Sequence, residues 1–149
     1  MMEKILLQNI LEQNKMTSSY SFNRITNENA GLMLNKQAAS IGFIYRHIGE
    51  TIHLFTTFLG LETNVQNTTM GCTDTGQGAD AKESRRLVTK GYELLADIIE
   101  TTPEADWLTL IDTPFFGKVT RVRLFSHILF HNSHHAGQIA LTLSRGGRL

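Results

Sequence analysis

The sequence predicts one all-α domain, residues 1–149, folded as a four-helix bundle with long crossover connections. Four long stretches repeat apolar side chains at the spacing of one helix face, and no segment has the convincing alternation of a strand. A chain of 149 residues is long enough for one apolar core and too short for two ordinary domains. Because each helix must bury its apolar stripe, packing of helix on helix is the expected solution.

The first predicted helix spans residues 2–25, where apolar side chains recur at loosely helical intervals. Residues 27–39 are rich in asparagine and show little periodicity, so we expect a connection there. Ser40 has the short polar side chain that caps a following helix. The apolar positions of the first helix are Ile5, Leu6, Ile10, Met16, Tyr20 and Phe22.

The second predicted helix spans residues 41–59 and ends before Gly60, a residue suited to the left-handed conformation after a helix. Residues 62–79 are rich in Asn, Thr and Gly, which favours a long exposed loop and a crossover between helices. The apolar stripe of this helix consists of Ile44, Ile48, Ile52, Phe55 and Leu59.

The third predicted helix spans residues 80–100, and Pro103 indicates that it has ended by then. Residues 107–117 are expected to be irregular. The fourth helix is predicted from residue 120 to residue 143, and the glycines at 146 and 147 follow it.

Composition excludes several classes of function. Lys plus Arg and Asp plus Glu both number 14, so the net charge is zero, and the absence of a basic run argues against nucleic-acid binding. Polar residues interrupt the first 14 positions, which argues against a signal peptide or a membrane span. Cys72 is the single cysteine, so no intrachain disulfide can form and a reducing, cytoplasmic location is expected.

The fourth predicted helix carries an unusual concentration of histidines. His127, His131, His134 and His135 lie within nine residues and represent four of the six histidines. His131 and His135 project about 40° apart, one helical turn from each other, and can therefore bind one ion. Imidazole is the commonest metal-binding side chain, so this spacing indicates a metal site.

A catalytic metal usually has three protein ligands, so a third donor is required from another helix. The second helix offers His47 and His53, which point about 120° apart and cannot both face one centre. His47 shares the stripe of inward-facing isoleucines and is the better candidate. The predicted metal ligands are therefore His47, His131 and His135.

Two further residues are candidates for catalysis. Gln138, next to Gly137 and one turn from His134, could hold a metal-bound water or a substrate group. Glu50, about one turn beyond His47, could orient the imidazole, accept a proton, or simply lie in solvent as most helix glutamates do. His127, one turn before His131, and His134, next to His135, could each be an alternative ligand, a partner of a ligand or a surface group, and we place both outside the site.

The sequence resembles the DinB/YfiT-like family, which includes bacillithiol-dependent and other thiol-dependent S-transferases. The resemblance rests on residues 40–48, the region of Trp107, and the motif His-Asn-Ser-His-His-Ala-Gly-Gln-Ile at 131–139. It implies that His47, His131 and His135 bind Ni²⁺ or Zn²⁺ in a four-helix bundle that often forms a homodimer. Ala136 stands where relatives often have a basic residue.

The leading hypothesis is a metal-dependent enzyme acting on a small molecule, either a thiol S-transferase using a low-molecular-weight thiol or a hydrolase. Three neutral imidazoles leave the full charge of the ion to activate a fourth ligand, a thiol or a water. The alternative is a non-catalytic protein in which the metal only clamps two helices together.

Other metal and hydrolase signatures are not met. A di-iron bundle needs two Glu-x-x-His motifs, and only the one starting at Glu50 is present. His131 is followed by Asn132, so the His-Glu-x-x-His signature of zinc proteases is missing, and Ser133 lacks the context of a nucleophile elbow.

Overall fold

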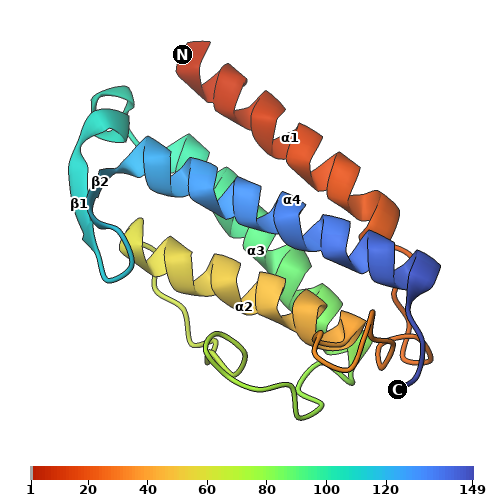
Figure 1. Cartoon of the computed structure of the whole chain (residues 1–149). Helices are drawn as coiled ribbons and strands as arrows, with labels where there is room; N and C mark the ends of the chain where they lie inside the picture. The colour runs from red at the N-terminus through yellow and green to blue at the C-terminus, as the bar shows by residue number, and fades with distance from the viewer. Residues whose placement is uncertain (1) are drawn as a thin grey trace.

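The computed structural model describes residues 2–149 (Figure 1). It is mostly helical, with four long helices, one short 3-10 helix (η1) and one small antiparallel sheet. No helix within these residues combines the length and the apolar character needed to cross a bilayer. The elements are α1 Met2–Phe22, α2 Ile41–Phe58, α3 Ala81–Thr101, η1 Glu104–Leu108, β1 Leu110–Thr113, β2 Gly117–Thr120 and α4 Arg121–Arg145.

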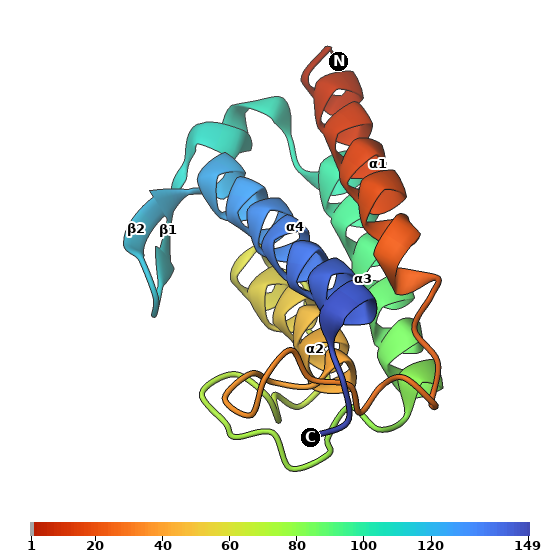
Figure 2. The ribbon, with the colours of Figure 1, turned by 45° about the vertical axis from the view of Figure 1, so that its right-hand side comes forward.

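The four helices pack in a closed ring of contacts. Helix α2 packs against α3 and α4, and α1 packs against the same two helices from the other side (Figures 1 and 2). The largest fully buried side chains come from α2, α3 and α4, so α1 covers a core that the other three helices form. These side chains are Tyr45, Phe125, Ile41, Ile48, Ile52, Leu87, Leu95, Ile98, Ile99, Leu124, Ile128 and Ile139.

Side-chain caps determine where three helices begin. The predicted cap Ser40 accepts a hydrogen bond from the backbone N–H of Phe43 at the start of α2. Asp80 and Thr120 do the same for α3 and α4. Gly60 has a φ of 101° just after α2, as its position predicted.

Helix α1 does not have the single apolar face of a simple amphipathic helix. Of the six apolar positions read from the sequence, only Phe22 is buried, while side chains such as Ile5 and Tyr20 are 54% and 70% exposed. The buried face instead uses Leu7 and Leu11 together with small polar residues. Helix α1 therefore has apolar side chains on two opposite faces, and only one of them packs on the core.

The prediction of a strand-free, irregular segment at 107–117 is wrong. Residues 110–113 pair with 117–120 in an antiparallel hairpin, and Leu110 lies opposite Thr120. Gly117 has a φ of 64°, which suits the tight turn after Pro114. Strands of four residues are too short for their alternation to stand out in the sequence, which explains the error.

Two connections lie against the start of α2. The segment 23–40 is fixed to the C-terminal residues, because Met33 and Gly147 exchange two backbone hydrogen bonds of 2.9 Å. The segment 59–80 is irregular, as predicted, but it is not wholly exposed: Thr69 is 2% exposed. Both connections thereby become parts of the walls around the N-terminal half of α2.

Close approach of two glycines holds the second connection in place. A β-carbon at Gly78 would overlap the backbone of Gly42 in α2, and a β-carbon at Gly42 would overlap the carbonyl of Gly78. Only glycine lets the two backbones come this close.

We predict that Gly78→Ala lowers the free energy of unfolding by about 1–3 kcal/mol, because the backbones must separate to admit the methyl group. Denaturant titration measures the change. Gly31→Ala is the control, since nothing lies within 4 Å of a β-carbon at that position. Equal stability of the two variants would contradict the packing described.

Candidate metal centre

Three imidazoles from two helices converge on one point. Helix α2 supplies His47, and α4 supplies His131 and His135; one ring nitrogen of each lies within 4.8 Å of the others. The Nε2 atoms of His47 and His131 are 3.0 Å apart. The structure thus brings together the three residues that the sequence singled out as ligands.

The helix packing explains this convergence. His131 and His135 lie one turn apart on the side of α4 that faces α2, and their ring centroids are 4.4 Å apart. His47 sits on the inward side of α2 beside the buried Ile44 and Ile48, and its ring lies 4.9 Å from each of the other two.

The three remaining histidines do not contribute a ring nitrogen to this point. His53 faces α3, where its Nε2 lies 3.0 Å from the carbonyl oxygen of Leu87, so His47 and His53 diverge as the helix geometry predicted. The ring of His127 packs against Phe116 at 4.6 Å. His134 is exposed, and its ring centroid lies 4.9 Å from that of His135. None of these three belongs to the converging group.

A hydroxyl group orients the ring of His47. Thr69 Oγ1 lies 3.2 Å from Nδ1 of His47 and donates its proton to Glu50 Oε2 at 2.8 Å. Because that hydroxyl has only one proton, it must accept from Nδ1–H of His47. The lone pair of the imidazole is then on Nε2, the atom that faces His131.

The carboxylate of Glu50 is buried and fully hydrogen-bonded. It is 1% exposed, so the alternative of a solvent-exposed glutamate is wrong. Arg46 Nε donates to it at 2.7 Å, and the backbone N–H and hydroxyl of Thr68 donate at 2.8 and 2.7 Å. Burial raises the pKa of Glu50, but the hydrogen bonds from Arg46, Thr68 and Thr69 lower it by more, which keeps the group ionised.

The side chain of Gln138 orients His135 in the same way. Its Oε1 lies 2.6 Å from Nδ1 of His135, and an amide oxygen can only accept, so Nδ1 carries the proton and Nε2 the lone pair. Nδ1 of His131 is buried without a hydrogen-bond partner in residues 2–149, and its Nε2 faces His47.

Burial keeps the three rings neutral. Together with the nearby His135, burial lowers the pKa of His47 to about 4 and that of His131 to about 3, and burial is the larger cause for both. Burial also lowers the pKa of His135. Neutral imidazoles offer lone pairs at pH 7. Tetrahedral ligands about 2.0–2.1 Å from zinc lie about 3.3 Å apart, which is close to the 3.0 Å between Nε2 of His47 and Nε2 of His131. The donor set fits a divalent cation.

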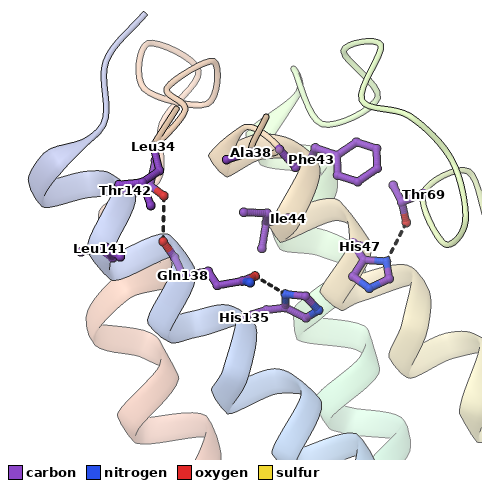
Figure 3. A pocket seen from close by; sticks show the side chains of 11 residues that line it. Leu34, Ala38, Phe43, Ile44, His47, Thr69, His135, Gln138, Leu141 and Thr142 are labelled. Atoms are coloured by element: carbon purple, nitrogen blue, oxygen red, sulfur yellow. Dashed lines mark hydrogen bonds between the residues drawn. The ribbon is translucent and has the colours of Figure 1, made fainter. Parts of the chain in front are cut away.

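A cavity of about 340 Å³ opens beside His47 and His135 (Figure 3). Its walls come from the connection 23–40, the first half of α2, the loop residue Thr69 and the second half of α4. The lining residues are Leu34, Ala38, Ala39, Phe43, Ile44, His47, Thr69, His135, Gln138, Leu141 and Thr142. Sequence reasoning found the histidines and Gln138 and missed Thr69, which lay unmarked in a threonine-rich loop.

Comparisons with known proteins agree with this architecture. A crystal structure of a DinB-like protein from Bacillus cereus matches with a TM-score of 0.74 and 16% identity, covering 92% of this chain and 90% of that one. A search of the curated proteins found no match. The family model described as the DinB superfamily matches residues 10–139. Since that match spans most of the sequence, the chain belongs to the DinB superfamily.

Proposed function

We propose that this protein is a metal-dependent enzyme for a small-molecule substrate, built as a four-helix bundle with Ni²⁺ or Zn²⁺ bound by His47, His131 and His135. One observation carries the proposal: three neutral imidazoles converge, and two of them, His47 and His135, line a cavity. Imidazole nitrogens suit both ions, and three protein ligands leave a position for an exogenous group.

The reaction that we propose is transfer to or from the sulfur of a low-molecular-weight thiol, with hydrolysis as the second candidate. A bound divalent ion would supply Lewis acidity, which makes a thiol or a water nucleophilic at neutral pH. The lining of the cavity is mostly apolar, and the position of the cavity between α2 and α4 lets substrate meet the imidazoles of His47 and His135.

Gln138 is proposed to position both a ligand and the substrate. Its amide oxygen is used by His135, so its NH₂ group is left to donate a hydrogen bond toward the cavity that Gln138 lines. A substrate carbonyl or ether oxygen would accept that bond.

Glu50 is proposed to act as a positioning residue rather than as a proton acceptor. Both of its oxygens already accept hydrogen bonds, and Thr69 stands between it and His47. Its negative charge polarises the Thr69 hydroxyl, which in turn holds Nδ1–H of His47 and directs Nε2 to the metal.

The proposed metal site predicts that His131→Ala abolishes stoichiometric binding of Zn²⁺ or Ni²⁺, because two donors remain of three. Isothermal titration of chelator-treated protein measures the stoichiometry. The matched control is His134→Ala, an exposed histidine on the same helix, which should bind one ion like the wild type.

The same two variants test catalysis. Conjugation of a thiol to a model electrophile by metal-loaded protein should be lost in His131→Ala and kept in His134→Ala. Unchanged metal stoichiometry in His131→Ala would remove it from the ligand set. Metal binding without an exchangeable ligand position would favour the helix clamp over the enzyme.

The proposed orienting role of Thr69 predicts that Thr69→Val weakens metal binding by about 10–100-fold, since the valine has the same shape but no hydroxyl. Thr69→Ser keeps the hydroxyl and should restore affinity. Thermal unfolding of the metal-free variants serves as the control for a merely structural effect. Equal affinities for Val and Ser variants, at equal stability, would exclude the role.

We also propose that the protein is a homodimer. The outward stripe of α1 exposes Ile5, Leu6 and Ile10, and an apolar surface of this kind suits a second copy of the chain. Sedimentation velocity should show a dimer that Leu6→Glu converts to monomer. Thr89→Glu, which adds the same charge to the exposed surface of α3, should leave the dimer intact; a monomeric wild type would refute the proposal.

A further inference from the structure

We infer that the cavity beside His47 and His135 selects a neutral, largely apolar substrate with a single polar head group. The metal that would bind the head group is taken from the proposed function. The preference for a neutral, apolar ligand rests on the cavity alone. The chemistry of the residues that line the cavity is the basis of this inference.

Apolar side chains form most of the cavity lining. Phe43 and Ile44 form a floor from α2, and each is 8% exposed. Leu34 and Leu141, from segments far apart in the chain, also line the cavity (Figure 3). Because they are 38% and 50% exposed, they lie toward its mouth. A ligand bound between these four side chains would contact carbon atoms on most sides, which favours an apolar ligand.

The polar groups of the lining are largely used within the protein. The Thr69 hydroxyl donates to Glu50, and the Thr142 hydroxyl donates to the backbone oxygen of Gln138 at 2.8 Å. The oxygen of the Gln138 amide accepts from His135. The Gln138 NH₂ group is thus the one side-chain donor of the lining, within residues 2–149, that a substrate can still engage away from the imidazoles.

No residue of the lining, as described for 2–149, carries a formal charge at neutral pH. Arg46, the basic residue next to His47 in sequence, is paired with Glu50 at 2.7 Å and is not part of the wall. A metal ion would place positive charge at one end of the cavity, where it meets the head group. A second charge, on the body of the ligand, would be buried without a partner, which is unfavourable.

The size of the cavity further limits the class of ligand that can bind. At about 340 Å³ it lies at the small end of the range of about 300–1,000 Å³ for small-molecule sites. A single aromatic ring or a short alkyl chain with one thiol, ester or carbonyl head suits this volume. A thiol that carries several carboxylates would bring charges for which the lining offers no partner.

A matched pair of thiols tests the selection. Benzyl mercaptan and 4-(mercaptomethyl)benzoate share one body and one head and differ by a carboxylate. Added to protein loaded with Co²⁺, each is followed by its thiolate-to-cobalt absorption band. We expect the dissociation constant of the neutral thiol to be at least about tenfold lower, a difference of about 1.4 kcal/mol.

Two arginine variants make the test specific to the cavity. Leu141→Arg places a cation at the mouth and should reduce the preference for the neutral thiol by about tenfold. Phe130→Arg adds the same charge to an exposed position of α4 outside the lining and should leave the preference unchanged. Calorimetry of metal-free protein with benzyl alcohol and 4-(hydroxymethyl)benzoate should show the same order.

The outcomes separate the inference from the proposed function. Equal affinity for both thiols, or a preference that Leu141→Arg leaves unchanged, overturns the inference while metal and thiol binding stand. Cobalt binding that His131→Ala does not alter overturns the metal site, and the metal-free calorimetry then decides the selectivity of the cavity by itself.

Discussion

A carboxylate cannot be buried in a protein at low cost unless donors surround it, and the burial of Glu50 therefore constrains much of the structure around it. The donors come from its own helix, through Arg46, and from the loop residues Thr68 and Thr69. Because the carboxylate accepts hydrogen bonds from these loop residues, the segment 59–80 packs against α2. The loop in turn contacts His47, so the charge of one glutamate links loop placement, ring orientation and the wall of the cavity.

The helices were predictable because local signals and packing agree. Ser40, Asp80 and Thr120 cap their helices, and the periodic isoleucines of α2 are buried as their spacing indicates. The convergence of His47 with His131 and His135 was predictable for the same reason. Spacing of one turn fixes the pair on α4, and the buried stripe of α2 selects His47 over His53.

Features that depend on long-range contacts were not predictable. The role of Thr69 arises only once Glu50 is buried opposite it, and a single sequence does not reveal that a glutamate is buried. The hairpin at 110–120 is too short for a periodic signal. The inward face of α1 uses Leu7 and Leu11, whereas the more numerous apolar residues of that helix face outward, so counting apolar residues indicates the wrong side.

The pairing of Met33 with Gly147 has a consequence for access to the interior. Leu34, at the mouth, adjoins a residue tied to the end of the chain by two backbone hydrogen bonds. Moving this rim aside would break both, at a net cost of about 1–3 kcal/mol. A wider entrance would then be a minor member of the native ensemble, populated at about 0.6–16%. The rate at which bulkier molecules enter would then be proportional to the small population of the open conformer.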